Sequence, residues 1–245
     1  MVMTNKIKPG ILYLIPTPLG DTAPELVMPS EAIIKLHQLD YLIVEQLRTA
    51  RRLLSKMKIN KPIDDIQFFE LNKRTVETET ERYLQPAIEG HSIGLLSEAG
   101  SPCVADPGAI IVRAAHKSGI KVVPLSGPSS ITMALMASGF NGQNFCFHGY
   151  LPIHNETRDK YIKTIEKSAV QSGQTQVFIE TPFRNNQLLD GLLKVCNPAT
   201  MLCIASNISL YDEFIVARSI SEWENRKPDI HKKPTVFLIW NEKRP

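Results

Sequence analysis

In the first half of the chain, short apolar segments alternate with segments of helical periodicity. The apolar segments are residues 11–15, 41–44, 66–69, 92–96 and 120–124. Each has the length of a strand, and continuous apolar character is typical of strands that are buried on both faces. Strands that alternate with helices at this spacing predict βαβ units and a mostly parallel sheet. Residues 1–124 are therefore predicted to form an α/β domain.

The pattern changes near Leu125. Further strands are predicted at residues 145–150, 176–180, 201–205, 213–217 and 235–240. The last three follow one another without a long helical segment between them, which predicts antiparallel pairing and a mixed sheet. A chain of 245 residues is long enough for two domains of ordinary size. Residues 125–245 are therefore predicted to form a second α/β domain.

Composition limits the function classes. A hydrophobic content of 43% with 22% charged residues is typical of a globular protein, and a net charge of +3 is too small for wholesale nucleic-acid binding. Any nucleic-acid surface must be local. The four cysteines have no Cys-x-x-Cys spacing, so neither a metal site nor a disulfide framework is expected. The N-terminus is not a signal peptide and no apolar run is long enough to span a bilayer, so we expect a cytoplasmic protein without a membrane contact.

Four unusual segments follow the predicted strands of the first domain. They are Pro16–Gly20, Glu45, the segment from Glu70 to Asn72, and Ser97–Asp106. Ligands of open α/β sheets bind beyond the carboxyl ends of the strands, and these ends share one edge of a parallel sheet. Together the four segments predict a site at that edge. Glu180 holds the corresponding place after a strand of the second domain, although each of these carboxylates alone could be a helix cap or an ion-pair partner.

The segment from Ser97 to Gly108 is longer than a strand-to-helix turn requires, since such turns usually take about 2–6 residues. It contains two glycines, two prolines and several other small residues. Small side chains leave the backbone open, so a flat or charged ligand can approach it closely. Asp106 and Pro107 are predicted to begin the next helix, as N-cap and first residue. The alternative is an over-long turn without a ligand.

Two more segments could bind negative groups. Six Lys or Arg and no acid lie between Gln46 and Ile63, and Arg48, Arg52 and Lys56 recur every four residues. This pattern fits a solvated helix face or a contact with a polyanion. The Gly/Pro/Ser segment at residues 125–130 opens a helix whose first amides could meet a negative group. Its serines could equally cap that helix.

The common nucleotide and hydrolase signatures are absent. The sequence has no Gly-x-Gly-x-x-Gly, no Gly-Lys-Ser/Thr and no Gly-x-Ser-x-Gly. What it has instead is an ordered set of shorter motifs. They are Leu12–Gly20, Glu45–Leu54, Ser97–Gly108, Pro124–Ser129, Gly149–Pro152 and Glu180–Arg184. This set resembles the tetrapyrrole methylase family of S-adenosylmethionine-dependent methyltransferases, in the branch that methylates cytidine 2′-hydroxyls of bacterial 16S ribosomal RNA.

The resemblance implies two αβα-type domains, with S-adenosylmethionine in the cleft between them, and a homodimer. The residues that match cofactor-contacting segments of the family are Pro16, Gly100, Ser101, Val104, Ser129, Ser130, Ile131, Ala205 and Pro234. The residues expected to bind the substrate are Arg48, Arg52, Glu70, Asn72 and Arg184. If the acceptor is a hydroxyl, a base is needed, and Glu45 and Glu180 are the candidates.

Departures from the family pattern fall mostly on the substrate side. Glu45-Gln46-Leu47-Arg48 stands where the RNA-methylating branch has Glu-Asp-Thr-Arg, and residues 207–210 replace its Glu-Leu-Thr-Lys. The order of the motifs and the basic face of Arg48, Arg52 and Lys56 make transfer of a methyl group to a ribose hydroxyl of ribosomal RNA the first hypothesis. Two alternatives stay open: a tetrapyrrole or other small acceptor, and a module that binds S-adenosylmethionine without catalysis.

Overall fold

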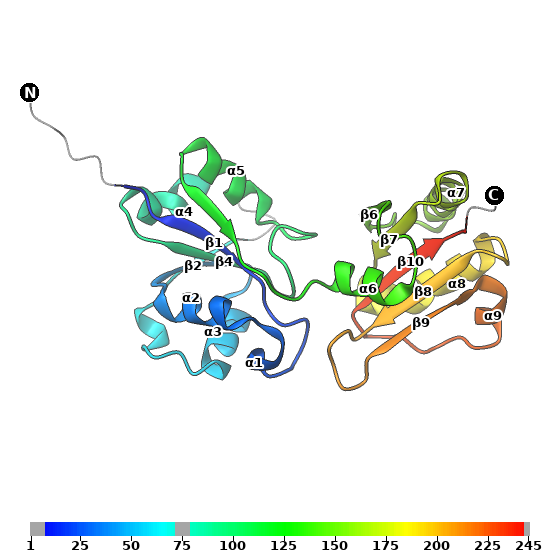
Figure 1. Ribbon diagram of the computed structural model, residues 1–245, viewed down its shortest axis with the longest axis horizontal. Helices are drawn as coiled ribbons and strands as arrows, with labels where there is room; N and C mark the ends of the chain where they lie inside the picture. The colour runs from blue at the N-terminus through cyan, green and yellow to red at the C-terminus, as the bar shows by residue number, and fades with distance from the viewer. Residues whose placement is uncertain (1–7, 72–78, 243–245) are drawn as a thin grey trace, which may run out of the picture. The chain divides into compact units, whose positions relative to one another are not determined.

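The computed structural model describes residues 8–71 and 79–242 (Figure 1). The chain divides into two compact units, Met1–Ser129 and Ser130–Pro245. The division falls a few residues beyond the predicted end of the first domain at residue 124. Both units are α/β, as the sequence predicts.

A five-stranded sheet forms the centre of the first unit. Its strands are β1 (Ile11–Ile15), β2 (Tyr41–Val44), β3 (Gln67–Glu70), β4 (Ile93–Leu96) and β5 (Lys121–Pro124). They stand in the order β3-β2-β4-β1-β5, and every pair is parallel. The predicted parallel sheet is thus confirmed. The carboxyl ends of all five strands consequently lie at one edge.

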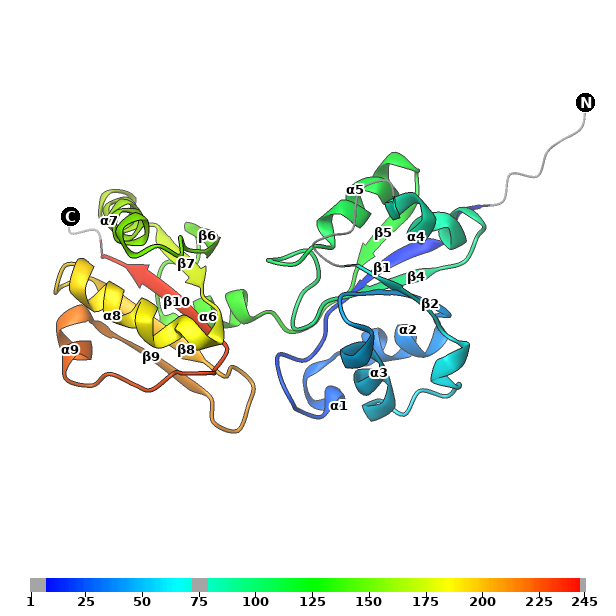
Figure 2. The same cartoon turned by 180° about the vertical axis from the view of Figure 1, so that it is seen from behind.

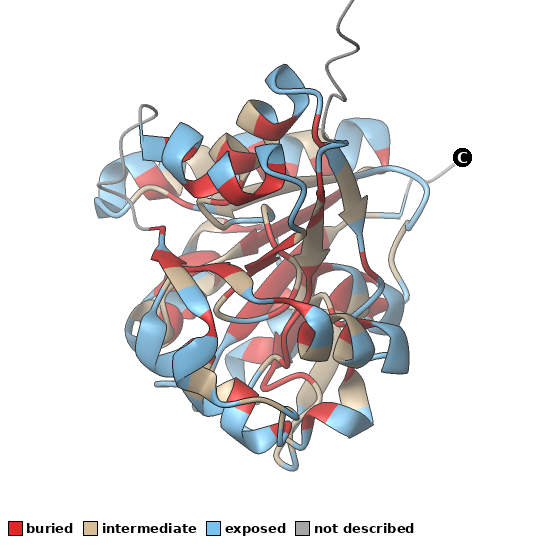
Figure 3. Ribbon diagram, turned by 90° about the vertical axis from the view of Figure 1, so that its left-hand side faces the viewer, coloured by how far each residue is buried: buried red, intermediate tan, exposed pale blue. Residues whose placement is uncertain are grey.

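Helices cover both faces of this sheet (Figure 1). One face carries α1 (Pro24–Val27), α2 (Ser30–Gln38), α3 (Leu47–Lys56) and the short 3₁₀ helix η1 (Ile63–Asp65), and the other carries α4 (Glu79–Ile88) and α5 (Ala109–Lys117). Neighbouring strand residues point to opposite faces, so Leu42 joins the α2–α3 core and Ile43 the α4–α5 core. Figure 3 shows buried residues along the strands and exposed residues on the outer sides of the helices.

The second unit contains a mixed sheet. Its strands are β6 (Phe145–Tyr150), β7 (Thr175–Ile179), β8 (Met201–Ser206), β9 (Phe214–Ser219) and β10 (Thr235–Trp240). The order is β6-β7-β10-β8-β9; β6 and β7 are parallel, and the other pairs are antiparallel. The antiparallel pairing predicted for the last three strands is confirmed.

Helices cover this sheet too. They are α6 (Ser130–Ser138), α7 (Asn155–Ser172), α8 (Asn185–Val195) and α9 (Ile220–Glu224), with the 3₁₀ helix η2 (Pro182–Arg184) ahead of α8. The main core lies under α7, α8 and α9, where Trp223 is fully buried and Phe178 stacks on Phe237. Figure 2 shows α8 lying in front of the sheet, while α6 packs against β8, β9 and β10.

Candidate functional site

The loops after β1 and β4 leave two adjacent strands toward opposite faces of the first sheet. The β1 loop leads to α1 and α2, and the β4 loop leads to α5. Such a point in an open α/β sheet is where ligands bind. Thr17 and Gly100 form an antiparallel bridge between the two loops, with both N···O distances at 3.0 Å. The sheet therefore holds its two most unusual loops together at one place.

Two buried hydroxyls secure this bridge. The Thr17 hydroxyl donates to the Ser97 carbonyl at 3.2 Å, and the Ser97 hydroxyl donates to the Gly100 carbonyl at 2.5 Å. Gly100 has a φ of 77°, and a Cβ there would lie 3.0 Å from a methyl group of Leu19. A residue with a side chain would be strained at this position. The loop backbone is thus fixed before any ligand arrives.

A third loop, at residues 125–129, packs against the other two. A Cβ on Gly127 would lie 2.5 Å from Cβ of Pro16, and the Ser101 hydroxyl donates to the Pro128 carbonyl at 3.3 Å. Pro16, Gly100 and Ser101, three residues predicted to bind the cofactor, thus lie in loops that contact one another. The structure brings them together, and their role in binding stays a prediction.

Val104 lies on a strained turn of the β4 loop. Its neighbours Cys103 and Ala105 have φ values of 68° and 59°, which are uncommon for residues with side chains, and the Val104 side chain is 46% exposed. Asp106 stabilises this turn, because its Oδ1 accepts from the amides of Cys103 at 3.1 Å and Gly108 at 2.7 Å. The turn thereby presents an apolar side chain to solvent, as a site for a flat ligand requires.

The start of α5 differs from the prediction. The helix begins at Ala109, with Gly108 as its N-cap, rather than at Pro107 with Asp106 as the cap. Asp106 instead closes the turn before the helix through the two amides just described. Burial raises the pKa of Asp106, and burial together with the Asp106 charge raises the pKa of the Cys103 thiol to about 11. Cys103 is therefore a protonated thiol at neutral pH.

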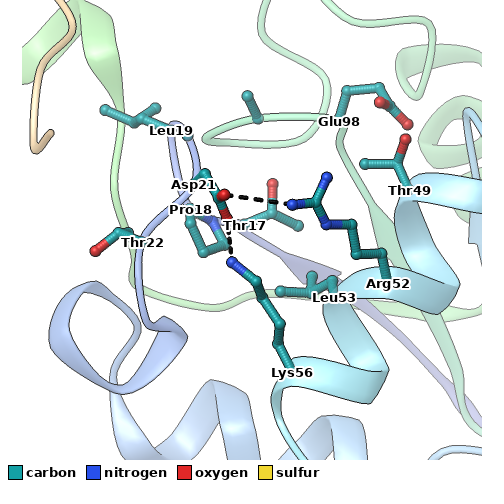
Figure 4. Close-up of a pocket in the computed structure, with 12 residues that line it drawn as sticks. Thr17, Pro18, Leu19, Asp21, Thr22, Thr49, Arg52, Leu53, Lys56 and Glu98 are labelled. Atoms are coloured by element: carbon teal, nitrogen blue, oxygen red, sulfur yellow. Dashed lines mark hydrogen bonds and ion pairs between the residues drawn. The ribbon is translucent and has the colours of Figure 1, made fainter.

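Glu98 contacts the N-terminal end of α3. Burial raises the pKa of its carboxyl, while hydrogen bonds from the Thr49 hydroxyl and the Gln46 amide lower it in part. Figure 4 shows Glu98 beside Thr49. Glu45, a predicted candidate base, is half-buried at the end of β2 and lines a small cavity of about 20 Å³ together with Thr17 and Glu98. Glu45 therefore lies in the same site as the bridged loops.

The basic face of α3 borders a hollow of about 210 Å³ (Figure 4). Its lining includes Arg52 and Lys56 on one side and the loop 17–22 on the other. Both cations pair with Asp21, a residue of that loop. Arg48 is exposed and makes no ion pair or hydrogen bond with side chains of residues 8–71 and 79–242. The predicted polyanion surface therefore includes both a free and a paired arginine.

Glu70, a predicted substrate residue, is the last residue of β3. Glu70 is exposed, and its carbonyl accepts from the Tyr83 hydroxyl at 2.8 Å. Its carboxylate therefore faces solvent at the same sheet edge as Glu45. Asn72 lies outside the described residues, and its prediction is unchanged.

In the second unit, Glu180 forms a buried ion pair with Arg184. The Glu180 side chain is 1% exposed, and its Oε1 accepts from Arg184 Nη2 and from the Thr181 amide, both at 2.6 Å. This bond raises the pKa of Arg184, and Tyr150 at the end of β6 adds to the effect. The second oxygen, Oε2, is buried and has no partner among the described residues. One oxygen of Glu180 thus accepts structural hydrogen bonds, and the other is available to a ligand.

The remaining predicted cofactor residues differ in exposure. Ser129 ends the first unit, and Ser130 and Ile131 begin α6 in the second. Ala205 is fully buried within β8, and Pro234 is an exposed residue just before β10 whose carbonyl accepts from the amide of a neighbouring loop. Pro234 can meet a ligand directly, whereas the side chain of Ala205 is enclosed by its own unit.

Sequence reasoning did not identify Asp21 and Thr49 as members of the site. The sequence signal for Asp21 is that residues 46–63 contain six Lys or Arg residues and no acid. Charges on such a helix attract acids from other segments, and Asp21 is the first acid after the Pro16–Gly20 loop. For Thr49 there is no local signal, because its contact with Glu98 arises only from the packing of α3 on the β4 loop.

No helix within residues 8–71 and 79–242 is long and apolar enough to cross a membrane. Among the same residues, no cluster of three or more His, Cys, Asp or Glu is arranged to hold a metal ion.

Comparison with known proteins connects this geometry to a family. Residues 12–224 match the model of the tetrapyrrole (corrin/porphyrin) methylases. Three relatives carry the name ribosomal RNA small subunit methyltransferase I. They come from Pasteurella multocida (29% identity, 94% of this chain and 79% of the relative), Thermotoga maritima (30%, 89% and 94%) and Bacillus subtilis (31%, 92% and 74%).

A solved structure has the same fold. The methyltransferase CobJ superposes with a TM-score of 0.64 at 17% identity, covering 96% of this chain and 97% of its own. At this identity the likeness concerns the fold.

Proposed function

Because the chain belongs to the tetrapyrrole methylase family of S-adenosylmethionine-dependent methyltransferases, we propose that its methyl acceptor is ribosomal RNA of the small subunit. The relatives named above support this acceptor. The observation that carries it in this chain is the basic face of α3, where Arg48 and Arg52 are exposed at the carboxyl edge of the sheet. Phosphate contacts by such residues supply most of the affinity of proteins for nucleic acids.

The first-unit loops suit S-adenosylmethionine. Between Ser97 and Gly108 the charged residues are Glu98 and Asp106 only, so this loop does not repel a cationic sulfonium. Val104 offers an apolar surface, and the Ser101 hydroxyl, which donates to the Pro128 carbonyl, can still accept a hydrogen bond. The cofactor supplies a methyl group on a positively charged sulfur. The part of the protein is to hold acceptor and methyl in line and to exclude water.

Transfer to a ribose 2′-hydroxyl, the acceptor atom that we propose, requires removal of a proton. Glu45 and Glu180 are the proposed candidates for the base. Glu45 lies within the site of the first unit, and Glu180 keeps one buried oxygen to which no described residue donates a hydrogen bond. Replacing a general base typically lowers the rate about 10²–10⁴-fold. The variants Glu45→Gln and Glu180→Gln are therefore compared by single-turnover methyl transfer. Replacing the true base should lower the transfer rate by that factor while the affinity for the cofactor stays the same.

The acceptor is tested with labelled S-adenosylmethionine and small ribosomal subunits. We expect label in the ribosomal RNA, released on digestion as a ribose-methylated nucleoside. A base-methylated nucleoside would contradict the 2′-hydroxyl, and label only in a tetrapyrrole or another small molecule would contradict the RNA acceptor. Absence of any transfer despite saturable cofactor binding would favour a non-catalytic binding module.

Charge reversal tests the α3 surface. Arg48→Glu with Arg52→Glu should abolish transfer to ribosomal subunits, because two phosphate contacts become repulsive. The matched control is Arg113→Glu with Lys121→Glu, which makes the same charge change at exposed positions of α5 and β5. Calorimetric affinity for S-adenosylmethionine should be the same in both variants. Equal loss of transfer in both would show a general effect of net charge and not a binding face.

A ribosomal substrate places the reaction in the cytoplasm, and we propose that the protein acts there as a homodimer. Light scattering of the purified chain tests the dimer, with a mass of twice 27.5 kDa expected.

A further inference from the structure

We propose that the hollow between the loop 17–22 and α3 binds one phosphodiester of the RNA backbone, and that Asp21 occupies that position in the free protein. Arg52 and Lys56 are the two cations that would exchange the Asp21 carboxylate for the phosphate. This inference rests on the proposed RNA acceptor and adds to it a phosphate subsite with a built-in competitor.

The geometry of the Asp21 contacts supports the exchange. One oxygen of the carboxylate, Oδ2, lies 3.3 Å from Arg52 Nη2, and the other, Oδ1, contacts Lys56 Nζ (Figure 4). A single anionic group with two oxygens thus bridges two cations one helical turn apart. A phosphodiester has two such oxygens and the same charge, and Arg and Lys are the usual protein partners of phosphate.

The hollow has the remaining features of an anion subsite. The Thr17, Thr22 and Thr49 residues line it, and Gly20 leaves its rim without a side chain. Glu98 is the other carboxyl in the lining. Burial raises the pKa of Glu98, and hydrogen bonds from Thr49 and the Gln46 backbone lower it in part. The volume of about 210 Å³ leaves room for a phosphate together with water.

Asp21 can be displaced at low cost. The exposed fractions of the three side chains are 68% for Asp21, 69% for Arg52 and 38% for Lys56. Ion pairs that are this exposed contribute little to stability. The hydrogen bond from Lys56 and the charges of Lys56 and Arg52 lower the pKa of Asp21. Asp21 is therefore an anion at neutral pH, where it competes with phosphate for the two cations.

A second pair on the same helix provides the contrast. Arg51 pairs with Asp64, and its guanidinium also lies 5.9 Å from the centre of the Phe68 ring. Arg51 therefore has a second contact that holds it in place, and neither it nor Asp64 lines the hollow. Both aspartates pair with an arginine of α3, and replacing either with Asn removes the same charge. Only Asp21 lines the hollow, so Asp64→Asn is the matched control for Asp21→Asn.

The experiment measures binding of a labelled single-stranded oligouridylate to the full chain by fluorescence anisotropy at several salt concentrations. We expect Asp21→Asn to bind RNA about 2- to 5-fold more tightly, the range that loss of a competing exposed ion pair allows. Asp64→Asn should bind as the wild type does. In a chain that carries Arg52→Gln and Lys56→Gln, Asp21→Asn should have no effect, because the cations for which it competes are gone.

The salt dependence gives a second readout. In the Asp21→Asn background, Lys56→Gln should reduce the slope of log affinity against log salt by about 0.7, the value for one phosphate contact to a single strand. Equal gains from Asp21→Asn and Asp64→Asn, or a gain that survives loss of both cations, would overturn the proposal. So would a gain in affinity for inorganic phosphate without a gain for the oligonucleotide, because the ligand would then be a free anion.

Methyl transfer to small subunits, measured on the same proteins, separates the two proposals. If the wild type transfers no methyl group to RNA but the binding results hold, the proposed function fails and the phosphate subsite remains. If transfer occurs while Asp21→Asn and Asp64→Asn bind RNA alike, the subsite fails and the proposed function remains.

Discussion

The exposed ion pairs beside α3 in the first unit differ from the buried carboxylates of the second unit. In the first unit, Asp21, Arg52 and Lys56 form ion pairs that are open to solvent. In the second, the carboxylates of Glu166 and Glu180 are less than a tenth exposed and accept hydrogen bonds from backbone amides. Exposed pairs exchange partners easily, whereas buried ones are costly to break. The exposed ion pairs beside α3 are therefore more readily available to a substrate than the buried carboxylates of the second unit.

Carboxylates that follow a strand have different surroundings in this protein. Glu45, Glu70 and Glu180 all hold that position, but their surroundings differ. Glu70 is exposed, Glu45 is half-buried, and Glu180 is enclosed with Arg184. Position at a strand end is thus insufficient to assign a chemical role, and the contacts of each oxygen decide it. The predictions below test the contrast between the units, from the largest expected effect to the smallest.

Replacing Glu166 should damage the second unit most. Its Oε1 accepts from the Asn197 amide at 2.5 Å and from the Thr200 hydroxyl at 2.7 Å, which ties α7 to the loop before β8. Glu166→Ala leaves both donors without a partner, so we expect a loss of about 3–4 kcal/mol in the free energy of unfolding. Urea unfolding followed by tryptophan fluorescence measures it, because Trp223 and Trp240 both belong to the second unit.

The control for this change is Glu156→Ala, which removes an exposed glutamate from the same helix. Its effect should stay below about 0.5 kcal/mol. Equal losses in the two variants would mean that burial of Glu166 contributes nothing, and the proposed contrast between the units would fail.

Breaking the Glu180–Arg184 pair should cost somewhat less. Arg184→Gln leaves a buried carboxylate without its cation, and because Arg184 is 33% exposed we expect about 2 kcal/mol, below the usual cost for a fully buried pair. Removing both charges, with Glu180→Gln and Arg184→Gln together, should recover at least half of that loss. Tryptophan fluorescence in urea again provides the measurement. A double variant as unstable as the sum of its parts would show that the two side chains do not interact.

Crowding the loops of the first unit should weaken cofactor binding. Gly127→Ala places a methyl group about where Pro16 already lies, since the Cβ distance would be 2.5 Å. The two loops must move apart, and we expect the affinity for S-adenosylmethionine to fall about tenfold, or about 1.4 kcal/mol. Isothermal titration calorimetry measures this. Gly142→Ala is the control, because a Cβ there meets no atom within 4 Å; an equal fall in that variant would contradict the role of the loop contact.

Much of the fold could be predicted from periodicity. The apolar segments mark all five strands of the first sheet, and their alternation with helices makes parallel pairing the expected result. The order of the strands could not be predicted in this way. Pairing of β1 with β4 and β5 depends on how the helices pack on both faces, and no local pattern encodes that choice.

The site, like the fold, could be predicted from the sequence only in part. That the loops after β1 and β4 share an edge follows from parallel strands, so Pro16 and Gly100 could be predicted to lie together. The contacts of Asp21 with Arg52 and of Glu98 with Thr49 could not be, because each joins segments that are distant in sequence. The start of α5 could not be predicted from its local sequence either. Asp106 accepts from the Gly108 amide, two residues on, as an N-cap would, yet the helix begins only at Ala109.

The smallest expected effect concerns the pH dependence of the first unit. Burial raises the pKa of Glu98, so the folded state binds its proton more tightly than the unfolded chain does. The stability of the wild type relative to Glu98→Gln should therefore be greatest below the ordinary carboxyl pKa and should fall as pH rises through the raised one. Glu98 is half-exposed, so the total change should stay below about 0.5 kcal/mol. Urea unfolding by far-UV circular dichroism between about pH 4 and about pH 7 measures it against Glu25→Gln, an exposed carboxyl in the same unit. If Glu98→Gln and wild type have parallel profiles, the contact with α3 does not involve the charge of Glu98.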